Sequence, residues 1–159
     1  MVHSAVIITA AVAAFVTLSP MAFAQQASQG TADEARAMLA KTVAAVKADK
    51  PQALDMIAKG EGGFLDRDLY PFCFNNTDGK VHPFPNPNAK ALFGQDERTI
   101  KDAAGKAYGQ ELFEAAQKPE GQISEVSYVF SKPGDSKPSP KVSFVSRAGD
   151  LGCAVGYYK

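Results

Sequence analysis

Helical periodicity characterises the chain from residue 31 to residue 60. Between residues 32 and 48, side chains that suit a core recur three and four positions apart, at Ala35, Met38, Leu39, Thr42, Val43 and Val46. This spacing predicts an amphipathic helix, and Thr31 with Glu34 three residues later forms a capping-box sequence at its start. A second helix is predicted from Pro51, which suits a first turn, to Gly60, which suits a helix end.

A hairpin is predicted next. Residues 69–75 (LYPFCFN) are apolar or aromatic at nearly every position, which is typical of a strand covered on both faces. Residues 76–79 (NTDG) form a turn sequence, and Val81 and His82 begin a short partner strand. The pattern therefore predicts two paired strands within residues 69–83.

A proline-rich loop and a change of period follow. Pro83, Pro85 and Pro87 end the short strand and stiffen the loop behind it. Helical spacing returns over residues 106–117, and after residue 119 the period becomes two. This predicts three more strands, at 122–130, 141–147 and 151–158. Short connections between these three strands favour an antiparallel sheet and an α+β fold.

The last predicted strand has one face of small residues. Gly152, Ala154 and Gly156 alternate with larger apolar side chains. Small residues on one face leave room above the sheet, either for a closely packed helix or for a ligand. Packing is the favoured interpretation, because glycine within a strand usually marks a close backbone approach.

The first 24 residues differ in composition from the rest, because they contain no Asp, Glu, Lys or Arg. Their apolar run from Ala5 to Leu18 has 14 residues, fewer than the roughly 20 that span a bilayer. Residues 22–24 (AFA) have the small-x-small pattern of a signal-peptidase site. We therefore predict a signal peptide (1–24), a flexible tether (25–30) and one domain (31–159), periplasmic or secreted and without membrane insertion. The alternative is a buried N-terminal helix.

Charge and chemistry exclude several classes of function. The 17 basic and 17 acidic residues cancel and are scattered along the chain, so we expect no nucleic-acid partner. His82 is the one histidine after residue 24, so a histidine-based metal cluster is excluded. Neither His82 nor Cys73 has a catalytic signature around it, and CxxC is absent. We expect no enzymatic activity, no metal and no cofactor.

Three stretches, taken in order, resemble a known family. They are DLYPFCFNNTDGKVHPFPNPN (68–88), LFGQDERTIKDAAGKAYGQELFEAA (92–116) and PKVSFVSRAGDLGCAVGYYK (140–159). They are similar to the single Cache domain of bacterial extracytoplasmic sensors. The resemblance implies a PAS-like fold, in which a five-stranded antiparallel sheet of order 2-1-5-4-3 lies behind a long N-terminal helix, with a pocket for a small extracellular ligand.

The resemblance also bears on Cys73 and Cys153, because it places the first and last strands side by side. Export supplies an oxidising compartment, and directly opposed residues on antiparallel strands lie within reach of a disulfide. We therefore predict a Cys73–Cys153 bridge, the alternative being two buried free thiols.

A ligand site follows from that pairing. It would place aromatic rings of the first strand beside the small residues of the last, with further rings on the third strand and three hydrogen-bond donors nearby. The predicted site residues are Phe72, Phe74, His82, Tyr128, Phe130 and Lys141. Lys141 is the expected carboxylate partner, because a lysine inside a sheet is costly unless it pairs with an anion. The alternatives are that the rings fill the core, and that His82 is satisfied by backbone groups.

Two functions remain after these exclusions. One is a periplasmic binding or sensor module for a small organic anion, which hands its signal to a separate membrane chemoreceptor or sensor kinase. The other is a secreted module of the same fold that binds a protein partner and no small ligand. Stabilisation by a ligand would separate the two.

Overall fold

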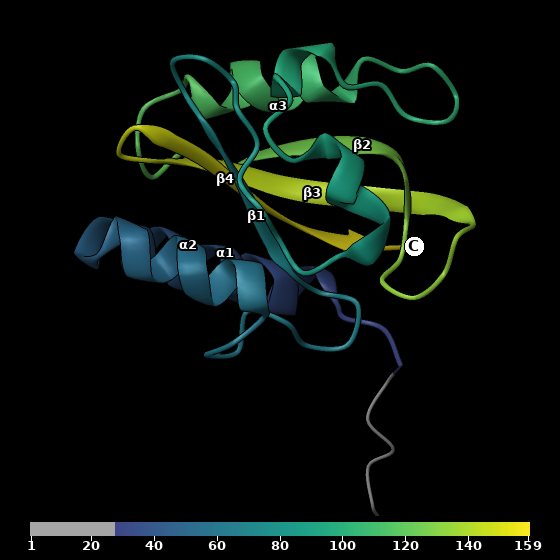
Figure 1. Cartoon of the computed structure of the whole chain (residues 1–159), viewed down its shortest axis with the longest axis horizontal. Helices are drawn as coiled ribbons and strands as arrows, with labels where there is room; N and C mark the ends of the chain where they lie inside the picture. The colour runs from purple at the N-terminus through teal and green to yellow at the C-terminus, as the bar shows by residue number, and fades with distance from the viewer. Residues whose placement is uncertain (1–27) are drawn as a thin grey trace, which may run out of the picture.

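The computed structural model describes residues 28–159 and arranges them in three layers (Figure 1). Helices α1 (Ala32–Ala48) and α2 (Lys50–Lys59) cover one face of an antiparallel sheet, and helix α3 (Tyr108–Ala116) covers the other. The predicted signal peptide and the first part of the tether lie outside the described residues.

The two N-terminal helices begin at the predicted caps. The Thr31 hydroxyl accepts a hydrogen bond from the Glu34 backbone N–H (3.3 Å), and the Glu34 carboxylate accepts one from the Thr31 N–H (2.8 Å). Asp49 is extended (φ −153°, ψ 91°) and caps α2 through the Gln52 N–H. Because Asp49 and Pro51 interrupt the helical hydrogen bonds, two helices stand here rather than the one long helix that the resemblance implied.

The described sheet has four strands. They are β1 (Pro71–Asn75), β2 (Ser124–Ser131), β3 (Pro138–Ala148) and β4 (Leu151–Tyr158), in the order β1-β4-β3-β2. This order is the expected 2-1-5-4-3 without its first member. The antiparallel α+β prediction is therefore confirmed, and the prediction of a fifth strand is not.

The missing strand is reduced to a single bridge between Phe74 and Val81. Backbone hydrogen bonds hold this short hairpin, from the His82 N–H to the Cys73 carbonyl (2.9 Å), from the Asn75 N–H to the Lys80 carbonyl (3.0 Å) and, across the turn, from the Gly79 N–H to the Asn75 carbonyl (3.0 Å). Pro83 has no N–H and ends the pairing. The Val81 N–H instead donates to the Gln95 carbonyl (3.0 Å), so the later part of the loop completes this edge.

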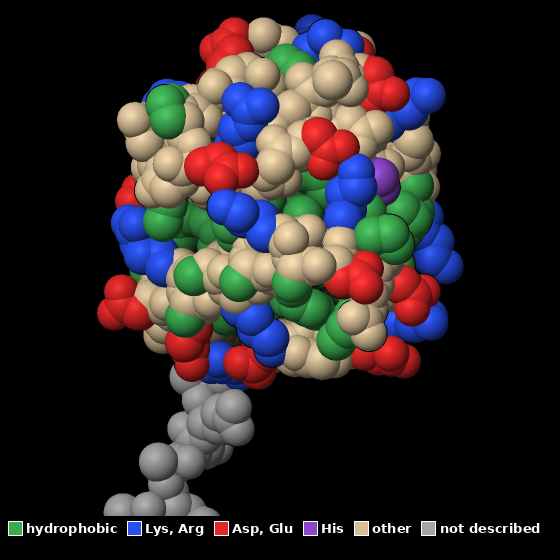
Figure 2. All heavy atoms as spheres, turned by 90° about the vertical axis from the view of Figure 1, so that its left-hand side faces the viewer, with side chains coloured by type: hydrophobic (Ala, Val, Ile, Leu, Met, Phe, Trp, Pro, Cys, Tyr) green, Lys and Arg blue, Asp and Glu red, His purple; other side chains and the backbone are tan. Residues whose placement is uncertain are grey.

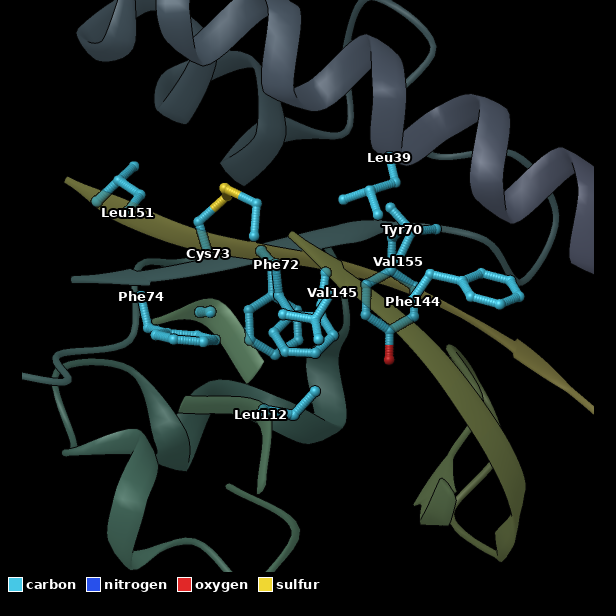
Figure 3. Packing of buried hydrophobic residues seen from close by; sticks show 14 of the residues in the cluster. Leu39, Tyr70, Phe72, Cys73, Phe74, Leu112, Phe144, Val145, Leu151 and Val155 are labelled. Carbon is cyan, nitrogen blue, oxygen red and sulfur yellow. A yellow bond between two sulfur atoms is a disulfide. The ribbon is translucent and has the colours of Figure 1, made fainter. Parts of the chain in front are cut away.

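The predicted disulfide between Cys73 and Cys153 is present. The two residues are direct partners in the register of β1 and β4, with Cα atoms 4.1 Å apart. The bridge lies on the sheet face covered by α1 and α2, while Phe72 and Phe74 project from the opposite face toward α3 (Figure 3). The disulfide thus joins two neighbouring strands beneath the helical layer.

The small residues of β4 make room for protein side chains. A Cβ atom at Gly152 would overlap the Phe74 ring and the Ala116 methyl group of α3. At Gly156 it would overlap the Lys141 side chain and the Ser143 hydroxyl. The favoured packing interpretation is therefore confirmed at both glycines.

We expect Gly152→Ala to lower the free energy of unfolding by about 1 to 3 kcal/mol, the usual cost of overpacking a core. The added methyl group would overlap the Phe74 ring and Ala116, and it would push both away from the sheet. Denaturant unfolding measures the loss, and Gly152→Ala with Phe74→Leu is the control. The smaller side chain should recover part of the stability, and a purely additive double variant would contradict the packing explanation.

Candidate functional site

An aromatic cavity lies between the sheet and the segments that cover its α3 side. Its volume is about 10 Å³, counted as the space open to the centre of a water molecule. That space holds about one water molecule. The lining residues come from the sheet, the residue before β1, the segment after β1 and the start of α3. They are Tyr70, Phe72, Val81, Phe84, Leu92, Glu97, Tyr108, Tyr128, Phe130 and Lys141.

Stacked rings form the walls. Tyr108 of α3 lies parallel to Tyr128 of β2, with ring centroids 4.1 Å apart and planes 3° from parallel. Tyr70, just before β1, stacks on Phe84 of the proline-rich loop at 5.6 Å. Such contacts hold rings in fixed orientations, so the loop and α3 are both tied to the sheet through aromatic pairs.

Lys141 of β3 is the cation of this cavity and is 2% exposed. Register places it between Tyr128 of β2 and Tyr158 of β4. Its ammonium group lies within 6.0 Å of the centroids of five rings, those of Tyr70, Phe72, Tyr128, Phe130 and Tyr158. Within residues 28–159 no carboxylate forms an ion pair with it. Aromatic faces offset part of the desolvation cost of a buried cation, and an anion would offset more.

Tyr70 connects Lys141 to a small polar network. Its hydroxyl accepts hydrogen bonds from Lys141 Nζ (2.9 Å) and Asn86 Nδ2 (2.8 Å). It lies 3.3 Å from the Tyr158 hydroxyl, which donates to the Ser131 carbonyl (2.9 Å). Lys141 has three N–H donors, and Tyr70 accepts one of them. The network positions the ammonium group and leaves it further donor capacity.

Glu97 supplies a carboxyl group to the cavity lining. It lies in the short helix η2 (Glu97–Thr99) and is 2% exposed. Gly109 allows this placement, since a Cβ there would collide with the Glu97 carbonyl. Burial, and next the neighbouring Asp96 carboxylate, raise the pKa of Glu97 to about 8. The side chain therefore holds its proton near neutral pH.

This pKa predicts a pH dependence of stability. The unfolded chain releases the Glu97 proton near pH 4.5, whereas the folded chain keeps it to about pH 8. The folded state thus binds more protons in this window, so stability falls as pH rises from 4.5 to 8. We expect Glu97→Gln to remove the part of this pH dependence that Glu97 causes. Denaturant unfolding across the window measures it, and a stability difference from wild type that does not grow with pH would contradict it.

The structure brings four of the six sequence-predicted site residues to the cavity: Phe72, Tyr128, Phe130 and Lys141. Phe74 lies outside the lining, because it fills the space above Gly152. His82 also lies outside it. Its Nε2 is hydrogen-bonded to Asn75 Oδ1 (2.8 Å), and burial lowers its pKa. A side-chain amide therefore satisfies His82, where the sequence suggested backbone groups or a ligand.

The remaining lining residues were not predicted. Tyr70 was within reach of the pattern, because it shares strand parity with Phe72 and Phe74. Tyr108 falls in the predicted helix of residues 106–117, but the sequence did not indicate which side chain it contacts. Glu97 had no local signal, because it stands between Asp96 and Arg98 in a stretch that is polar by sequence.

The surface of the protein carries charges of both signs. On the face drawn in Figure 2, basic and acidic side chains alternate without gathering into a patch of one sign. Among residues 28–159, no helix is both long and apolar enough to cross a membrane. The same residues contain no group of three His, Cys, Asp or Glu side chains placed to hold a metal ion.

The chain belongs to the single Cache domain 2 family, whose model matches residues 12–157. Cache domains are sensor modules, and the fold and aromatic cavity described above agree with that assignment. No curated protein matches the sequence significantly.

Solved structures of chemotaxis sensors share the fold. A methyl-accepting chemotaxis protein from Vibrio parahaemolyticus RIMD 2210633 has a TM-score of 0.61 at 21% identity, with 79% of this chain and 86% of that chain covered. A periplasmic sensor domain of a chemotaxis protein has a TM-score of 0.56 at 22% identity, covering 79% and 88%. A Cache chemosensory domain described for carboxylic acid recognition has a TM-score of 0.56 at 24% identity, covering 79% and 86%.

Proposed function

We propose that this protein is a periplasmic or secreted sensor module that binds a small organic acid in the aromatic cavity. The observation that carries the proposal is Lys141, a buried lysine that no carboxylate pairs within residues 28–159. A ligand carboxylate would supply the missing anion through charge-assisted hydrogen bonds. The carboxylic acid recognition described for one Cache domain of the same fold is consistent with this ligand class.

The size of the cavity sets a condition on binding. Its volume of about 10 Å³ holds about one water molecule, so even a two-carbon acid needs additional space. Phe84 and Leu92 of the segment after β1 form part of the lining, and they lie in neither the sheet nor α3. We propose that this segment moves outward to admit the acid and then closes over it.

A sensor module of this kind would act by binding to another protein. Single Cache domains are extracellular or periplasmic sensors. We propose a membrane chemoreceptor or sensor kinase as the separate partner that detects the acid-bound state. The nearly filled cavity also favours the second candidate function, a module that binds a protein partner and no small ligand.

A thermal-shift panel of short organic acids tests the proposed function. A ligand that binds the folded state alone stabilises it by about 2.7 kcal/mol at a hundredfold excess over Kd. We expect at least one monocarboxylic acid of two to four carbons to raise Tm in a concentration-dependent manner, with chloride at equal ionic strength as the control. If no acid raises Tm, the partner-only function is favoured instead.

A further inference from the structure

Glu97 lacks a partner in the cavity. No hydrogen bond to its carboxyl group is found within residues 28–159, although the residue is 2% exposed and lines the same space as Lys141. The two side chains form no ion pair with each other. A carboxyl group in the wall of a nearly closed cavity is satisfied only by what occupies that cavity, either a water molecule or a ligand with a suitable polar group.

Glu97 is held in this position by the surrounding backbone. Its N–H donates to the Gly79 carbonyl (2.8 Å), and Asp96 caps its short helix through the Arg98 N–H (3.1 Å). The first turn of α3 packs directly against its carbonyl at Gly109. Lys141, by contrast, comes from the sheet. An acidic and a basic side chain therefore reach one aromatic cavity from different elements.

We propose that Glu97 is a second ligand-binding residue, and that the cavity selects short acids that carry an amino or hydroxyl group in addition to the carboxylate. This inference rests on the proposed function, in which Lys141 binds the carboxylate. Glu97 then discriminates among acids of equal length, because a plain aliphatic acid leaves its carboxyl group unsatisfied.

Both kinds of second group suit Glu97. In its neutral form the carboxyl group accepts a hydrogen bond from a ligand hydroxyl through its carbonyl oxygen and can donate one through its O–H. A ligand ammonium group instead favours the ionised carboxylate and pairs with it. Glu97 and Lys141 are each 2% exposed, so either contact is stronger here than on the surface.

Calorimetry with three-carbon acids tests this selection. The ligands are propionate, lactate, 3-hydroxypropionate, alanine and β-alanine, which differ in the second polar group and its position. We expect at least one substituted acid to bind about tenfold or more tightly than propionate, as one additional buried polar contact allows. Glu97→Leu should abolish that preference, and Glu97→Gln should keep it for a hydroxy acid and lose it for an amino acid.

The outcomes separate this inference from the proposed function. Glu111→Gln is the matched control, because Glu111 is an exposed glutamate on α3 that pairs with Lys106 at the surface, and it should leave the preference unchanged. Equal affinities for all five acids, or a preference that survives in Glu97→Leu, would overturn the role of Glu97 while the acid-binding function stands. The absence of binding by every acid would overturn the proposed function itself.

Discussion

Removal of the disulfide is expected to lower the free energy of unfolding by about 4 kcal/mol. The bridge closes a segment with a sequence separation of 80, which begins within β1 and ends within β4. Without it the unfolded chain gains the conformational freedom of that segment. Since small domains have total stabilities of about 5 to 15 kcal/mol, Cys73→Ala with Cys153→Ala should be marginally folded.

Denaturant unfolding with and without a reductant measures this effect. Wild type should lose stability when reduced, and the double alanine variant should not respond to the reductant. Identical unfolding of oxidised and reduced wild type would show that the bridge does not contribute. Two alkylated thiols per chain in unreduced, denatured protein would mean that the bridge does not form.

Replacement of Lys141 is expected to separate ligand binding from stability. Lys141→Met keeps a long side chain above Gly156 but removes the ammonium group. If Lys141 binds the acid through a charge-assisted hydrogen bond, affinity should fall by about 1.5 to 3 kcal/mol, or about 10- to 150-fold. The free energy of unfolding should stay the same or rise, because a buried cation without an anion is replaced by an apolar group.

Calorimetry and thermal unfolding of the same samples give both readouts. Lys137→Met is the control, because Lys137 is an exposed lysine in the connection between β2 and β3 and its loss should change neither. Unchanged affinity in Lys141→Met would remove Lys141 from the site. A large loss of stability would show that its ammonium group serves the fold.

Local sequence patterns correctly predicted several helices and strands. The capping box of Thr31 and Glu34 and the apolar spacing behind it placed α1 at the residues where it is found. The Cys73–Cys153 pairing that the resemblance implied led to Phe72, which lines the cavity together with Lys141. The capping box and the apolar spacing depend on hydrogen bonds and periodicity over a few residues, which is the range that a single sequence reveals.

Features that depend on contacts between residues far apart in sequence were predicted wrongly or not at all. Val81 was expected to start a strand, but its backbone pairs with Gln95 beyond the proline-rich loop. Phe74 was expected in the ligand site, yet the space it fills lies beneath Ala116 of α3. Glu97 has a polar sequence context and becomes buried when α3 packs against its backbone at Gly109. None of these partners is close in sequence.

A crystal structure of the protein with the acid that most raises Tm tests the central claim directly. The account predicts electron density for the acid between the sheet and α3, with its carboxylate within hydrogen-bond distance of Lys141 Nζ and with Phe84 displaced outward relative to the ligand-free protein. An acid bound elsewhere on the molecule, with the rings around Lys141 still closed on one another, would contradict it.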